Sequence, residues 1–104
     1  MNLKSPQLFK SASLTDPFEQ LKTQYLASFG AKSARIKKAL DDEDHAALFH
    51  LAHQLAGSAG SYGFDDISSA CLALEESLQH AHNINQTVTA RCETVLALIN
   101  QAKT

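Results

Sequence analysis

The chain has 104 residues, a length that argues for one small domain, and its formal net charge is −2 with the histidines neutral. This mildly acidic balance argues against a nucleic-acid-binding protein, which usually needs a basic face, and no apolar run is long enough for a membrane span. Hydrophobic residues make up 44% of the chain, enough for one core. The two cysteines lack CxxC spacing, so we expect reduced core thiols in a cytoplasmic protein.

The first predicted helices lie before residue 41. Scattered leucines and a phenylalanine predict a short N-terminal lid helix within residues 1–15. Asp16-Pro17 is a strong helix start, because aspartate caps a helix and proline suits its first position. One long helix is then predicted to about residue 40, kinked or interrupted at Gly30. It is indicated by an apolar stripe with a spacing of about 3.6 residues, formed by Phe18, Leu21, Tyr25, Phe29, Ile36 and Leu40.

Three further amphipathic helices are predicted after the acidic run 41–44. This run lacks the glycine and the terminal glutamate of a calcium loop, so Asp44 is expected to cap the next helix, which Gly63 should end. The expected core stripes are Leu48, Leu51, Ala52, Leu55, Ala59 and Tyr62; Ile67, Ala70, Cys71, Leu74, Leu78 and Ala81; and Val88, Cys92, Val95, Ile99 and Ala102. The sequence thus predicts a single all-α domain, an up-down antiparallel four-helix bundle over residues 16–104 with a short extra N-terminal helix.

The most unusual feature is a histidine followed by glycines inside the helix predicted after Asp44. On a helical wheel His53 points away from the core arc by roughly 140°. A helical glycine costs about 1 kcal/mol relative to alanine, so outward glycines need a reason. We interpret them as clearing space beside His53 for a bulky partner, with close helix packing as the alternative. The outward strip consists of Ala46, Phe49, His50, Ala56, Gly57 and Gly60.

The motif His53-Gln54-Leu55-Ala56-Gly57-Ser58, followed by Gly63 and by Leu74-Glu75, resembles the signature of histidine-containing phosphotransfer (HPt) domains of two-component phosphorelays. The resemblance extends over the whole bundle, and Asp44 matches the cap that precedes the family's histidine helix. It implies that His53 accepts the phosphoryl group and that Gly57 gives a partner access. Glu75 matches a polar position beside the imidazole, where a hydrogen bond could fix the tautomer of the ring.

The resemblance also implies partners and the absence of a cofactor. His53 would accept the group from the aspartyl phosphate of a receiver domain, in a response regulator or a hybrid sensor kinase, and pass it to another receiver. The chain has no P-loop for ATP, so it would be a carrier without kinase activity, and Mg²⁺ would belong to the receiver. We expect a cytoplasmic monomer with no nucleic-acid or membrane partner.

One position departs from the family pattern. Relatives usually carry lysine three residues after the histidine, where this chain has Ala56, and the predicted helix has no other lysine or arginine. The loss should weaken the stabilisation of phosphohistidine without abolishing transfer. His50 could supply part of the charge when protonated, and Gln54 is a further supporting candidate. Phe49, Ala56 and Gly60 are the expected docking contacts.

Two other functions stay open at this stage. The missing cation at Ala56 is compatible with an adaptor that docks on receivers without transferring a group. A metal-binding bundle is the other alternative, because His50 and His53 are three residues apart, a workable ligand spacing. His80 and His82 flank the next loop. Against this alternative, no Glu-x-x-His pair occurs, and His45 projects away from His53 on the wheel.

Overall fold

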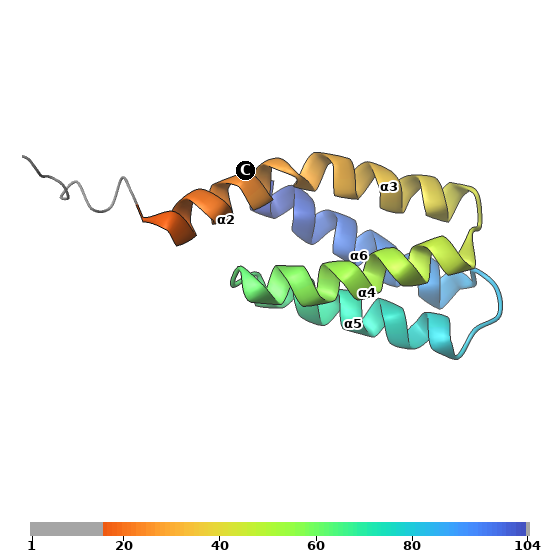
Figure 1. Cartoon of the computed structure of the whole chain (residues 1–104). Helices are drawn as coiled ribbons and strands as arrows, with labels where there is room; N and C mark the ends of the chain where they lie inside the picture. The colour runs from red at the N-terminus through yellow and green to blue at the C-terminus, as the bar shows by residue number, and fades with distance from the viewer. Residues whose placement is uncertain (1–15, 104) are drawn as a thin grey trace, which may run out of the picture.

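The computed structural model describes residues 16–103, and every regular element in that range is a helix (Figure 1). The predicted all-α class is therefore confirmed, whereas the predicted lid helix within residues 1–15 lies outside the described residues. The helices are α2 (Pro17–Ala27), α3 (Phe29–Asp41), α4 (His45–Ser61), α5 (Asp65–Gln79) and α6 (Gln86–Lys103).

The four helices α3 to α6 form the bundle, and α2 continues from the start of α3 beyond one end of it (Figure 1). Each bundle helix packs against two others, α3 on α4, α4 on α5, α5 on α6 and α6 on α3. Because the connections between them are short, successive helices run antiparallel, the up-down arrangement that the sequence predicts.

The core consists of hydrophobic side chains from all four bundle helices. The predicted stripes of the last three helices supply most of it. The stripe residues that are only partly buried are Leu51, Tyr62, Ala70, Ala81 and Ala102. The buried residues are Phe29, Ile36, Ala39, Leu48, Ala52, Leu55, Ala56, Ala59, Ile67, Cys71, Leu74, Leu78, Val88, Cys92, Val95 and Ile99. Both cysteines are free core thiols, and burial raises the pKa of Cys71 to about 12 and that of Cys92 to about 11.

The single long helix predicted over residues 17–40 is wrong in two respects. The interruption lies at Ser28, whose backbone N–H bonds to the carbonyl of Tyr25 in a tighter turn, and Gly30 is inside α3. Because α2 runs past the end of the bundle, it has no buried residue, and Phe18 and Leu21 remain 46% and 48% exposed. These two side chains are therefore not part of the core.

An aromatic cluster attaches α2 to the bundle. The ring of Tyr25 stacks on that of Tyr62, just past α4, with 4.4 Å between the centroids, and Phe18 stacks on Tyr62 at 6.0 Å. The Tyr25 hydroxyl is hydrogen-bonded to that of Ser58 in α4. Burial raises the pKa of the Tyr25 phenol, as expected for a half-buried hydroxyl. The contacts of α2 with α4 thus centre on Tyr25.

The helix ends follow the predicted punctuation. The carboxylates of Asp16 and Asp44 accept hydrogen bonds from the backbone N–H groups of Phe18 and Ala47, each at 3.0 Å. Gly63 has φ +85°, a left-handed conformation that favours glycine and ends α4. These boundaries set where His53 stands along α4.

Candidate functional site

The candidate site is built on the pair α4 and α5. His53 of α4 faces Glu75 of α5, and its Nδ1 lies 3.2 Å and 3.3 Å from the two carboxylate oxygens. The side chain of His53 is 69% exposed, whereas that of Glu75 is only 15% exposed. An ionised carboxylate can only accept hydrogen bonds, so Nδ1 is the donor. In the neutral ring, Nε2 is then the nitrogen with the free electron pair.

Small residues on α4 allow α5 to pack this closely. The Ser68 hydroxyl of α5 donates to the carbonyl of Ala56 at 2.7 Å, and a Cβ added to Gly60 would lie only 3.2 Å from the Ser68 oxygen. Close packing, the alternative explanation offered for the glycines, therefore accounts for Gly60. A docking role for Gly60 stays a prediction.

Gly57 differs from Gly60 because it faces open space. A Cβ added to Gly57 would meet no atom within 4 Å, and the residue is exposed one turn after His53. The structure therefore gives Gly57 no packing role against another helix. Because Gly57 lies next to the exposed imidazole, its lack of a side chain leaves room for a partner to approach His53.

A shallow hollow of about 350 Å³ opens between His53 and α5. Its walls come from His53, Ala56, Gly57, Leu72 and Glu75. Leu72 is 56% exposed, and the sequence analysis did not single it out. A signal was present in the sequence, because Leu72 lies off the core stripe of α5 and three residues before Glu75.

The structure distributes the other candidate residues differently from the wheel. Ala56 is only 5% exposed, so the expectation that it points outward is wrong, because α5 covers it. Phe49 is half-buried and packs against the core. His50 and Gln54 are exposed but lie on the α3 side of α4, away from Glu75. The roles proposed for these four residues stay predictions.

Basic side chains near α4 come from α3. Lys32 and Arg35 line a small hollow of about 100 Å³ together with Gln54 and Ser58. The Lys32 ammonium donates to the hydroxyl of Ser28 and lies 4.9 Å from the centroid of the Tyr25 ring. Burial, with a smaller contribution from Arg35, lowers the pKa of Lys32. These cations stand on the side of α4 opposite to Glu75.

The remaining histidines have separate surroundings. The Nε2 of His45 lies 2.7 Å from the carbonyls of Leu78 and Ala81, at the end of α5, and Nδ1 of His80 lies 2.9 Å from the carbonyl of Glu76. Within residues 16–103, no group of three or more His, Cys, Asp or Glu side chains is placed to hold a metal ion. In the same range, none of the helices is long and apolar enough to cross a membrane.

Comparison with known proteins gives one match. A family model described as "Hpt domain" matches residues 20–103, which include all of α3 to α6 and most of α2. Comparisons with curated proteins and with solved structures gave no significant match.

Proposed function

Because the chain belongs to the Hpt domain family, whose members are histidine phosphotransfer carriers of two-component systems, we propose that His53 carries the phosphoryl group. The donor is the aspartyl phosphate of one receiver domain and the acceptor is the aspartate of another. The observation that carries this proposal is the contact between Nδ1 of the exposed imidazole and the recessed Glu75 carboxylate.

This contact prepares the ring for nucleophilic attack. With the proton held on Nδ1 by Glu75, the electron pair of Nε2 attacks the phosphorus atom of the aspartyl phosphate. The N–P bond forms while the P–O bond to the aspartate breaks, and that electron pair stays on the leaving carboxylate. The phosphorylated ring keeps its Nδ1 proton and gains positive charge, which the Glu75 carboxylate balances. No proton has to move in this step.

The surroundings of His53 suit the docking of a partner domain. Gly57 leaves the space next to the ring open, and Leu72 offers an exposed apolar contact across the hollow. Apolar side chains that become buried when a partner binds often anchor protein interfaces. The receiver supplies Mg²⁺ and most of the charge stabilisation, because α4 has no lysine or arginine. The chain itself supplies the nucleophile and its orientation.

A non-transferring adaptor is the second candidate, and Ala56 is the observation that favours it. With no lysine or arginine on α4 and Ala56 buried, the basic side chains that line the two hollows between α3 and α4 come from α3. An adaptor would bind receivers through the same surface but form no phosphohistidine.

Transfer of a radiolabel separates these functions. Purified receiver domains from the same organism, phosphorylated with labelled acetyl phosphate, are mixed with the chain and with its His53→Gln and His82→Gln variants. We expect an acid-labile, base-stable label on the wild type and on His82→Gln, an exposed histidine outside the site, and none on His53→Gln. Helicity measured by circular dichroism should be unchanged, because His53 is 69% exposed.

Two results would overturn the proposal. Undiminished labelling of His53→Gln would exclude His53 as the acceptor. If the wild-type chain bound receivers but acquired no label, the adaptor function would be favoured. The role of Glu75 is tested in the same assay, since Glu75→Ala removes the partner of Nδ1–H and should slow labelling by about tenfold or more.

A further inference from the structure

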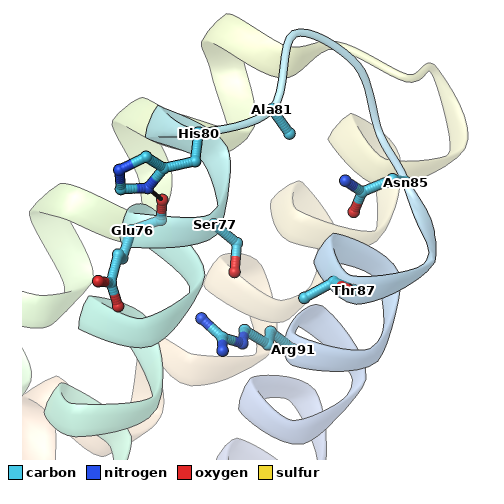
Figure 2. Close-up of a pocket in the computed structure, with 7 residues that line it drawn as sticks. All are labelled: Glu76, Ser77, His80, Ala81, Asn85, Thr87 and Arg91. Carbon is cyan, nitrogen blue, oxygen red and sulfur yellow. Dashed lines mark hydrogen bonds between the residues drawn. The ribbon is translucent and has the colours of Figure 1, made fainter.

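A second polar hollow lies on the other side of α5, between its C-terminal end and the first turns of α6 (Figure 2). Its volume is about 330 Å³, and it is open to solvent. Its lining includes Glu76, Ser77, Asn85, Thr87 and Arg91, and none of them touches the His53 site. Neither phosphotransfer nor the core accounts for this cluster.

Arg91 is the central residue of this hollow. Its side chain is half-buried, and Nη1 donates to the carbonyl of Ala73 in α5 at 2.7 Å, which holds the guanidinium across the gap between the two helices. Within residues 16–103, no carboxylate forms an ion pair with Arg91, although Glu76 lines the same hollow. A guanidinium has five N–H donors, so the donors that Ala73 does not use remain available, in a fixed geometry, to a second acceptor.

Neighbouring side chains add neutral hydrogen-bonding groups. The Ser77 hydroxyl donates to the same carbonyl of Ala73 at 3.1 Å and therefore sits next to the guanidinium, as Figure 2 shows. The Asn85 carbonyl oxygen accepts from the N–H of Val88, which leaves its NH₂ group as a donor. Thr87, exposed in the first turn of α6, brings a second hydroxyl. The Ser77 proton is already used, so Arg91, Asn85 and Thr87 supply the donors that a ligand could reach.

We propose that this hollow binds a small oxyanion, a phosphate or carboxylate group, on the Arg91 guanidinium, with Asn85 and Thr87 as further hydrogen-bond donors. The N–H donors of Arg91 that Ala73 does not use favour a second acceptor, and an arginine fork binds two oxygens of a carboxylate or of a phosphate with two parallel hydrogen bonds. Glu76 accepts a hydrogen bond from a hydroxyl or ammonium group of the same molecule, so substituted anions bind more tightly than the bare ion.

Titration followed by NMR tests this site on the ¹⁵N-labelled chain at physiological ionic strength, with inorganic phosphate, glycerol phosphate and glycine as separate probes. The first is a bare ion, and the other two combine an oxyanion with a hydroxyl or an ammonium group. We expect saturable shifts of the amide signals around residues 85–91, with tighter binding of a substituted probe than of phosphate. Which substituted probe binds best distinguishes a phosphate ligand from a carboxylate ligand.

Variants of Arg91 and its neighbours distinguish a role of Arg91 in binding an anion from a purely structural role. Arg91→Gln should weaken binding by at least about tenfold, while Arg35→Gln, which replaces the only other arginine of the chain, should bind like the wild type. Thr87→Val removes an exposed hydroxyl at little cost to the fold and should weaken binding severalfold, which keeps the test decisive if Arg91→Gln is unstable. The proposal is overturned if no probe gives saturable shifts, or if Arg91→Gln and the wild type bind equally.

Discussion

The pair α4–α5 and the helix α2 differ in how far their apolar side chains are buried. Along α4 and α5, small residues bring the two backbones close enough for Ser68 to bond to the carbonyl of Ala56. The core leucines of these helices are buried, namely Leu48, Leu55, Leu74 and Leu78. Helix α2 also carries apolar residues at helical spacing but has no buried residue, and its contacts with α4 centre on Tyr25. An apolar stripe therefore stabilises a helix only where another helix is present to cover it.

This difference decides where a precise site can be built. The contact between His53 and Glu75 joins two helices, so its geometry is set by the packing between them rather than by a loop. No residue of α2 lines the hollow at His53. Changes in α4 and α5 should therefore affect both stability and function, whereas changes in α2 should affect little of either.

The largest expected effect comes from truncating matched leucines in the two regions. Leu74→Ala in α5 leaves a cavity in the core and should lower the free energy of unfolding by roughly 2–5 kcal/mol, because Leu74 is fully buried. Leu21→Ala in α2 should cost less than about 1 kcal/mol, because the side chain is 48% exposed. Urea unfolding followed by circular dichroism measures both. Equal losses would contradict the contrast between the regions.

Alkaline pH should weaken the α4–α5 pair through Cys71. Burial raises the pKa of this thiol from 9.0 to about 12, so between these values the unfolded chain loses the proton that the folded chain keeps. Stability contributed by the neutral thiol is therefore present below pH 9 and is lost as the pH rises toward 12, by roughly 2 kcal/mol at about pH 10.5. Urea unfolding at neutral and alkaline pH should show a smaller loss for Cys71→Ala than for the wild type. The same loss in both proteins would exclude this origin.

The smallest expected effect distinguishes the two glycines of α4. Gly57→Ala should raise the free energy of unfolding by up to about 1 kcal/mol, because alanine favours the helix and nothing lies within 4 Å of the new methyl group. Gly60→Ala should raise the free energy of unfolding by less, because its methyl group would lie 3.2 Å from the Ser68 oxygen. Urea unfolding of both variants checks the order, which an equal gain would contradict. Under the proposed function, Gly57→Ala should also slow labelling by receivers.

The sequence was sufficient to predict the last three helices and most of the core. Periodicity identified α4, α5 and α6, while Asp16, Asp44 and Gly63 marked helix ends. The predicted stripe on α6 is buried except for Ala102, which is partly buried. Local rules succeed here because a cap or a stripe depends on residues within a few turns of each other. The residues His53 and Glu75 were also placed on facing helices, although only through the family resemblance.

Features that depend on a neighbouring helix could not be predicted in this way. A helical wheel gives the direction of Ala56 from its own axis, but it does not reveal that α5 covers this direction. The exposure of Phe18 likewise follows from the end of the bundle rather than from its place in the stripe. Leu72 became a candidate contact only when the structure placed it across the hollow from His53. Tertiary context, not helix propensity, accounts for each of these differences.

The one-sided opening at His53 has a kinetic consequence. Glu75 occupies Nδ1, so under the proposed function the donor and the acceptor must both reach Nε2 through the same hollow. Two receivers cannot then be engaged at once, and turnover follows a ping-pong order in which the first leaves before the second arrives. An excess of dephosphorylated donor would compete with the acceptor for binding at His53 and would lower the rate of phosphoryl transfer.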